Sequence, residues 1–128
     1  MTKTIVFNPK AVDSLLSYAR MQHPKEGVLL LRGKVDKEKI VVTDTEIPPF
    51  ATHGNGFTSF PLHMLPIDFS IVGVAHSHPS GALKPSLMDL NRFYGRIMVI
   101  IAYPYQTQQD IVVFDNEGKP LKYEVVKA

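Results

Sequence analysis

The spacing of apolar residues predicts a helix near the start of the chain. The apolar positions at helical spacing are Val12, Leu15, Leu16 and Ala19. They recur three and four residues apart, which is the period of one helix face. Asn8 and Pro9 precede them, and these residue types favour the N-cap and the first helical position. Because the residue before a proline disfavours helical backbone, Pro24 predicts that the helix ends near Gln22.

Shorter apolar runs, bounded by glycine, proline or turn residues, predict strands. These strands cover residues 26–33, 39–45, 71–78, 97–103, 110–114 and 121–126. A second helix is expected over 86–94, ended by Gly95, and a hairpin turn over 115–118. Residues 48–66 hold four prolines and two glycines, which predicts a long loop with a short edge strand at 56–60. The order of elements predicts one α/β domain over residues 1–128, with a central mixed sheet flanked by two helices.

Composition narrows the classes of protein and of site. The 128 residues carry a formal net charge of +2 and include no cysteine. Disulfides, iron–sulfur clusters and thiolate zinc sites are therefore excluded, so any metal site would use histidine and carboxylates. No dense basic stripe is present, and no nucleic-acid partner is expected. The apolar runs are too short to span a bilayer and no secretory signal opens the chain, so we expect a cytoplasmic protein with no membrane partner.

Two histidines close the predicted strand at 71–78. Since alternate residues of a strand point to the same face, His76 and His78 are side by side and can bind one divalent ion. The second predicted helix begins at Ser86, and its first turn brings Asp89 back toward the pair as an anionic ligand. Two imidazoles and one carboxylate match a catalytic zinc site with an open position for water. Such a site lowers the pKa of water toward about 7.

Hydrolysis of an amide bond also needs a proton acceptor and a donor to the oxyanion. Glu26 opens a predicted buried strand beside Gly27. A carboxylate in that position is costly unless it has a partner or a function, so Glu26 is the candidate general base. The hydroxyl of Ser86 can donate to the oxyanion of a tetrahedral intermediate.

Each of these features also has a simpler structural interpretation. Most His-x-His pairs are surface or core histidines without a metal. Ser86 and Asp89 have the spacing of a helix capping box, although an Asp on the first turn can cap the helix and still face a metal. Glu26 can equally be an exposed residue at the end of a loop. Taken together, rather than one by one, these residues favour a catalytic metal site.

The joint pattern is Glu26, then His76-Ser77-His78, then seven residues, then Ser86-Leu87-Met88-Asp89. It resembles the JAMM motif of the JAB/MPN/Mov34 metalloenzymes at every motif position, and the order of elements matches over nearly the whole chain. The resemblance is to small single-domain archaeal and bacterial members that are desampylase-like. It implies one MPN/JAB-like (cytidine-deaminase-like) domain, a zinc ion on His76, His78 and Asp89, Glu26 as the base, and Ser86 at the oxyanion.

The resemblance also implies an isopeptidase that hydrolyses the bond after the C-terminal glycine of a ubiquitin-like modifier. Its partners would be that small modifier protein and its lysine-linked conjugates. The expected edge strand is the candidate substrate-binding segment, because an extended tail can add to a strand edge; it consists of Gly56, Phe57, Thr58, Ser59 and Phe60. Two alternatives stay open: a JAMM peptidase that releases a small product from a ubiquitin-like sulfur carrier, and a non-catalytic MPN scaffold. The oligomeric state is also open, with a dimer among the options.

Overall fold

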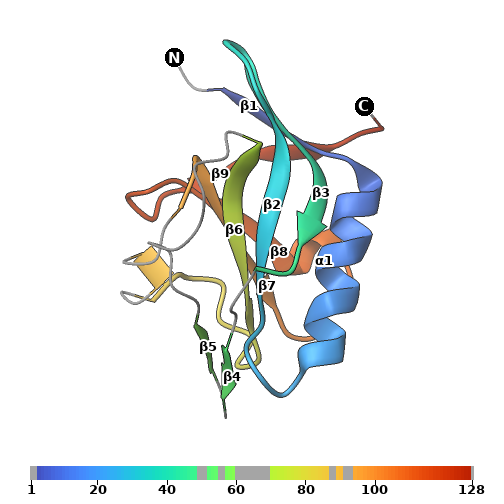
Figure 1. The fold of residues 1–128 in the computed structure, drawn as a ribbon, viewed down its shortest axis with the longest axis vertical. Coiled ribbons are helices and arrows are strands. Elements are labelled where there is room, and N and C mark those ends of the chain that lie inside the picture. The colour runs from blue at the N-terminus through green and yellow to red at the C-terminus, as the bar shows by residue number, and fades with distance from the viewer. Residues whose placement is uncertain are drawn as a thin grey trace.

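One eight-stranded sheet forms the centre of the molecule (Figure 1). The computed structural model describes residues 3–48, 52–54, 57–59, 70–86, 89–90 and 94–127, with the backbone alone for 52–54 and 57–59. The strands of this sheet are β1 (Thr4–Phe7), β2 (Val28–Val35), β3 (Lys39–Glu46), β6 (Ile71–His78), β7 (Ile97–Ala102), β8 (Ile111–Phe114), β9 (Pro120–Leu121) and β10 (Tyr123–Val125). Helix α1 (Pro9–Gln22), the short 3-10 helix η2 (Gln108–Asp110) and a separate pair of strands, β4 (Thr52–Gly54) and β5 (Phe57–Ser59), complete the described elements.

The sheet is mixed, with the strand order β10-β1-β3-β2-β6-β7-β8-β9. Strand β6 lies near its centre, antiparallel to β2 and parallel to β7. Strand β1 is parallel to both of its neighbours, β3 and β10. The expected α/β fold with a central mixed sheet is therefore confirmed.

Helix α1 covers one face of the sheet. The side chain of Asn8 accepts a hydrogen bond from the Lys10 N–H at 3.0 Å, and Pro9 occupies the first turn, as the sequence predicts. The buried residues of the helix are Ala11, Val12, Leu15, Leu16 and Ala19. They pack in one cluster with Leu29, Leu31, Ala75, Val99 and Ile101 from the central strands.

The opposite face of the sheet has its own smaller apolar cluster. It consists of Val28, Leu30, Ile71, Val74, Met98, Ile100 and Phe114, with Leu90 and Tyr94 packed against it. Every residue of β6 is buried, because this strand has packed side chains on both faces. Since side chains alternate along a strand, His76 and His78 continue the face of Val74, away from α1.

Several predicted boundaries differ from those in the structure. Strand β1 was not predicted, and the predicted strand at 26–33 starts two residues later and runs on to Val35. The predicted strand at 121–126 is divided into β9 and β10 around Lys122. For the predicted helix at 86–94, Leu90 N–H donates to Ser86 O at 3.1 Å and residues 89–90 are helical; residues 87, 88 and 91–93 lie outside the described residues.

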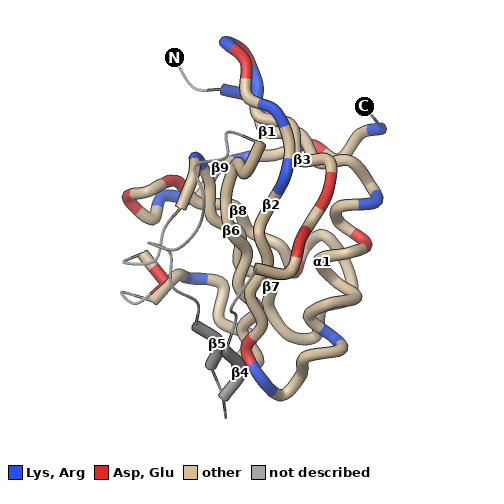
Figure 2. Tube along the Cα trace, viewed as in Figure 1, with Lys and Arg blue, Asp and Glu red and all other residues tan. Residues whose placement is uncertain are grey.

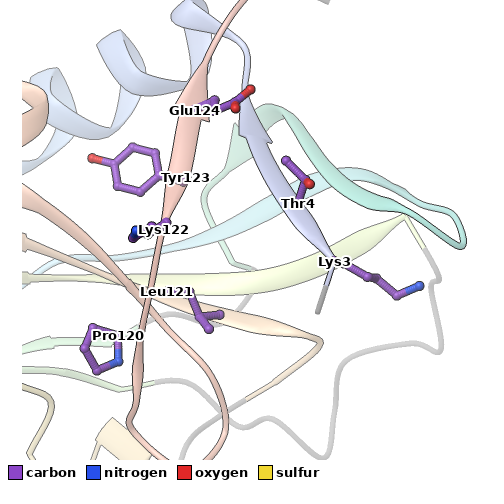
Figure 3. Close-up of a pocket in the computed structure, with 7 residues that line it drawn as sticks. All are labelled: Lys3, Thr4, Pro120, Leu121, Lys122, Tyr123 and Glu124. Carbon is purple, nitrogen blue, oxygen red and sulfur yellow. The ribbon is translucent and has the colours of Figure 1, made fainter. Parts of the chain in front are cut away.

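The end of the chain connects the two ends of the strand order. Strand β9 pairs with β8, and β10, one residue later, pairs with β1. Where this segment crosses from one neighbour to the other, it borders a pocket of about 600 Å³ (Figure 3). The Tyr123 hydroxyl donates to the carbonyls of Gln108 and Ile111 at 2.7 and 2.9 Å, which fixes the crossing.

The charged residues of the described chain do not gather by sign. Figure 2 shows Lys and Arg interspersed with Asp and Glu along the tube. No helix within the described ranges is long and apolar enough to cross a membrane.

Candidate metal centre

The two histidines of the predicted metal site lie at the end of β6. His76 is 7% exposed and His78 is 6% exposed. Val28 of β2 lies opposite His76, so the pair faces away from α1. Two buried imidazoles on one face of a central strand are rigidly held, as a ligand pair must be.

His78 contacts Asp89 directly. Its Nε2 lies 3.1 Å from Asp89 Oδ2, and its Nδ1 lies 3.0 Å from the carbonyl oxygen of Ala82. Because a carbonyl can only accept, Nδ1 must carry a proton and donate it. In the neutral imidazole, Nε2 then presents its lone pair toward a carboxylate oxygen. Two such atoms this close need a cation between them, which is either a proton or a metal ion.

Asp89 is held by the cap of the helical turn that contains it. Ser86 N–H donates to Asp89 Oδ2 at 2.8 Å, and Asp89 N–H donates to Ser86 Oγ at 3.0 Å. This reciprocal pair is a capping box, so the simpler interpretation of the Ser86 and Asp89 spacing is correct. It does not exclude the chemical one, because the same Oδ2 atom also faces His78.

Charges and burial set the protonation of this pair. Burial opposes the charged form of Asp89, but the hydrogen bonds from His78 and Ser86 and the charges of His76 and His78 outweigh it and lower the Asp89 pKa to about 2. Burial likewise opposes the charged form of His78, but the bond to Asp89, with smaller contributions from the Ala82 carbonyl and the charge of Glu26, raises the pKa of His78. The pair therefore favours a carboxylate beside a positive charge.

Glu26 lies beside the histidine pair. Ser77 N–H donates to Gly27 O at 3.0 Å, which continues the β2–β6 pairing one residue beyond Val28. One residue further, the same register sets Glu26 opposite His78, on the face of the two histidines. The carboxylate of Glu26 is close enough to raise the pKa of His78.

An aromatic cluster formed by His23, Tyr103 and Tyr105 contains a tyrosine that feels the charge of Glu26. The rings of His23 and Tyr103 stack with centroids 4.9 Å apart, and Tyr105 meets both edge-on. Burial and the charge of Glu26 raise the pKa of Tyr105. Glu26 is thus within electrostatic reach of His78 and of Tyr105.

The donor types, and the separation of two of the donor atoms, fit a zinc ion. Among the described residues, no three His, Asp or Glu side chains converge closely enough to enclose an ion, although His78 and Asp89 are in hydrogen-bond contact. Ligand atoms about 2.0–2.2 Å from a tetrahedral zinc ion lie roughly 3.4 Å from each other. The observed 3.1 Å is close to that separation. Two imidazoles and a carboxylate are also the ligand types of catalytic zinc sites.

The remaining predicted site residues are only partly described. Phe57, Thr58 and Ser59 form β5, which pairs with β4, while Gly56 and Phe60 lie outside the described residues. Sequence reasoning gave no role to Ser77, whose Oγ accepts a hydrogen bond from Gly27 N–H at 2.6 Å. A small hydroxyl residue between two histidines, on a strand buried on both faces, was the available signal.

Comparisons with known proteins point to one family. The family model described as prokaryotic homologs of the JAB domain matches residues 8–115. A probable metalloprotease from Haloferax volcanii is 37% identical over 125 residues, which cover 92% of this chain and 77% of the relative. A JAB1/MPN domain protein from Archaeoglobus fulgidus is similar with a TM-score of 0.69 and 28% identity, over 96% of this chain and 98% of that one. A structure described as JAMM, a metalloprotease-like zinc site in the proteasome and signalosome, has the same TM-score at 26% identity, over 98% and 99% of the two chains.

Proposed function

Because the chain belongs to the JAMM family, among the prokaryotic homologs of the JAB domain, we propose that it is a zinc-dependent isopeptidase. Its substrate is a ubiquitin-like modifier joined through its C-terminal glycine to a lysine. The observation that carries the proposal is the contact between His78 Nε2 and Asp89 Oδ2, with His76 and Glu26 on the same side of the sheet. The description of the Haloferax relative as a probable metalloprotease supports the same chemistry.

His76, His78 and Asp89 hold the zinc ion in this proposal. When bound, zinc supplies a Lewis acid for the scissile carbonyl and lowers the pKa of water. The protein's contribution is to orient the ligands. The Ala82 carbonyl fixes the tautomer and the ring plane of His78, and the Ser86 N–H fixes Asp89. Such supporting hydrogen bonds orient metal ligands and tune their basicity.

Glu26 moves the proton. Its carboxylate accepts a proton from the attacking water while the water oxygen bonds to the carbonyl carbon. It then gives that proton to the lysine nitrogen as the carbon–nitrogen bond breaks. The products are the free carboxylate of the modifier and the free lysine amine. A carboxylate beside a buried histidine pair is suited to both transfers.

Ser86 stabilises the oxyanion. Its Oγ accepts the Asp89 N–H, and this bond leaves the hydroxyl hydrogen available to donate. An oxyanion donor of this kind acts mainly in the transition state, where the negative charge develops.

The β4–β5 pair is the proposed binding site for the C-terminal tail of the modifier. These strands are hydrogen-bonded to each other and form a sheet separate from the main one. Figure 1 shows them beyond the end of the main sheet at which β6 terminates. An extended tail that adds to β5 would make main-chain hydrogen bonds while its last glycine reaches the histidines.

The test is cleavage of a ubiquitin-like protein joined by an isopeptide bond to a lysine peptide. We expect the zinc-loaded wild type to cleave it and a chelator to abolish cleavage. Glu26→Ala should lose about 100-fold or more of the rate while it keeps its zinc. Glu38→Ala, at an exposed glutamate between β2 and β3, is the matched control and should match the wild type.

Two other results would contradict the proposal in different ways. A folded, zinc-loaded wild type that cleaves only a small product from a sulfur-carrier tail favours the peptidase alternative. A folded wild type that holds no zinc and cleaves nothing favours the scaffold alternative.

A further inference from the structure

We propose that Ser77 is a positioning residue that holds Glu26 in register with the two histidines. The inference rests on the function proposed above, because it concerns the geometry of the general base. Ser77 is 1% exposed and lies between His76 and His78 on β6. Since side chains alternate along a strand, it points to the α1 face, behind the site. It therefore acts without touching the substrate.

Two hydrogen bonds join Ser77 to the residue next to Glu26. Its N–H donates to Gly27 O at 3.0 Å. Its Oγ accepts the Gly27 N–H at 2.6 Å, in a buried position. A regular antiparallel ladder would send the Gly27 N–H to the Ser77 carbonyl instead. The side-chain oxygen thus replaces a backbone acceptor at the point where β2 leaves the sheet.

The position of Gly27 is also fixed by packing. A Cβ at Gly27 would lie 2.5 Å from a ring carbon of Tyr18 and 3.3 Å from Ser77 Oγ. Tyr18 belongs to α1, so the helix packs closely against Gly27 while Ser77 of β6 binds its backbone. The backbone that carries Glu26 has little room to move as long as both contacts persist.

These contacts set the distance between Glu26, the proposed base, and the two histidines. His76 and His78 are set by β6, and Glu26 is set through Gly27 by the residue between those two histidines. One side chain therefore couples the base to the ligand pair. Loss of the Ser77 hydroxyl leaves the Gly27 N–H without its acceptor. Glu26, the next residue, is then no longer held in a fixed position.

The experiment compares Ser77→Ala, Ser77→Thr and Ser77→Val. Thr keeps the hydroxyl, and Val has nearly the same shape as Thr but lacks the hydroxyl. In Ser77→Ala and Ser77→Val we expect kcat to fall by roughly 10- to 100-fold, the penalty for a misplaced catalytic group. KM and zinc per chain should stay unchanged, and amide hydrogen exchange at Gly27 should become faster. Ser77→Thr should recover slow exchange and, relative to Ser77→Val, most of kcat.

Ser17→Ala, at an exposed serine of α1, is the control for the substitution itself. The proposal is overturned if Ser77→Ala and Ser77→Val keep the wild-type kcat, if they lose zinc, or if Gly27 exchange does not change. If Ser77→Ala does not fold, the Thr and Val pair still decides the question. A wild type that hydrolyses no isopeptide defeats the proposed function first and the inference with it. An active wild type with unaffected Ser77 variants defeats the inference alone.

Discussion

His78 and Asp89 are eleven residues apart in the chain, yet Nε2 of the one lies 3.1 Å from Oδ2 of the other. The segment between them is anchored at both ends. The carbonyl of His78 accepts the Gly81 N–H at 3.0 Å, and its ring binds the Ala82 carbonyl. At the other end, the capping box with Ser86 holds Asp89. Asp89, the proposed third ligand, is therefore positioned by protein contacts that do not depend on a metal.

The two roles of Asp89 can be separated by Asp89→Asn. The amide oxygen still accepts the Ser86 N–H, so the contribution of the cap to the free energy of unfolding, about 1 kcal/mol, should be kept, and only the contribution of the charged pair with His78 should be lost. The charge on the ligand is lost, so zinc affinity should fall by more than the roughly 10- to 100-fold that follows loss of an outer partner. Urea unfolding and zinc titration measure the two effects. An unchanged zinc affinity would remove Asp89 from the ligand set.

The two roles of Ser86 can be separated in the same way. Ser86→Ala should lower the free energy of unfolding by about 1 kcal/mol because the cap is lost, whereas Ser86→Gly should lower it by only a few tenths. Both variants lack the hydroxyl, so both should lose activity by about 100-fold or more. Denaturant unfolding and initial rates are the measurements. Near-normal activity in Ser86→Gly would show that the serine serves as a cap alone.

The metal-free protein should have a window of extra stability in mild acid. The His78 pKa is raised, so its contribution is fully present below the ordinary value of 6.5 and is lost as pH rises through the folded-state pKa. The Asp89 pKa is lowered to about 2, so its contribution is present above the ordinary value of 3.8 and is lost as pH falls toward 2. Thermal unfolding with chelator should show this gain between pH 4 and pH 6.5 in the wild type, and Asp89→Asn should lack it.

The raised pKa of Tyr123 should lower the free energy of unfolding at alkaline pH. Burial raises its pKa to about 12 from an ordinary value of 10.0. Below pH 10 this tyrosine is neutral in both the folded and the unfolded state. Between pH 10 and pH 12 the unfolded state is ionised while the folded state stays neutral, so the free energy of unfolding falls as pH rises through this range. Tyr123→Phe should be less stable than the wild type at pH 8, because the Gln108 and Ile111 carbonyls lose a donor. The difference should narrow at pH 11. A constant difference across this range would contradict the prediction.

Local patterns in the sequence predicted the parts of the site that depend on local geometry. The alternation of side chains on a buried strand was enough to set His76 and His78 on one face. Asn8, Pro9 and the spacing of apolar residues were enough to predict helix α1. Asp89 was singled out by its spacing from Ser86, as a capping residue and as a candidate ligand. These features depend on a few neighbouring residues.

The features that sequence reasoning missed depend on pairing between distant segments. Strand β1 has four residues and is formed by parallel pairing with β3 and β10, which are far along the chain. The division of the last strand arises because its two halves pair with different neighbours. The contact of Ser77 with Gly27 follows from the β2–β6 register, which no local pattern encodes.

The division of the last strand has a consequence for self-association. Strands β9 and β10 are the outermost strands of the main sheet, and they contain two and three residues. Edges this short present few backbone groups to a second molecule, and short edge strands are one way in which sheet proteins avoid edge-to-edge aggregation. Within the part of the chain that is described, the main sheet is thus protected against uncontrolled growth.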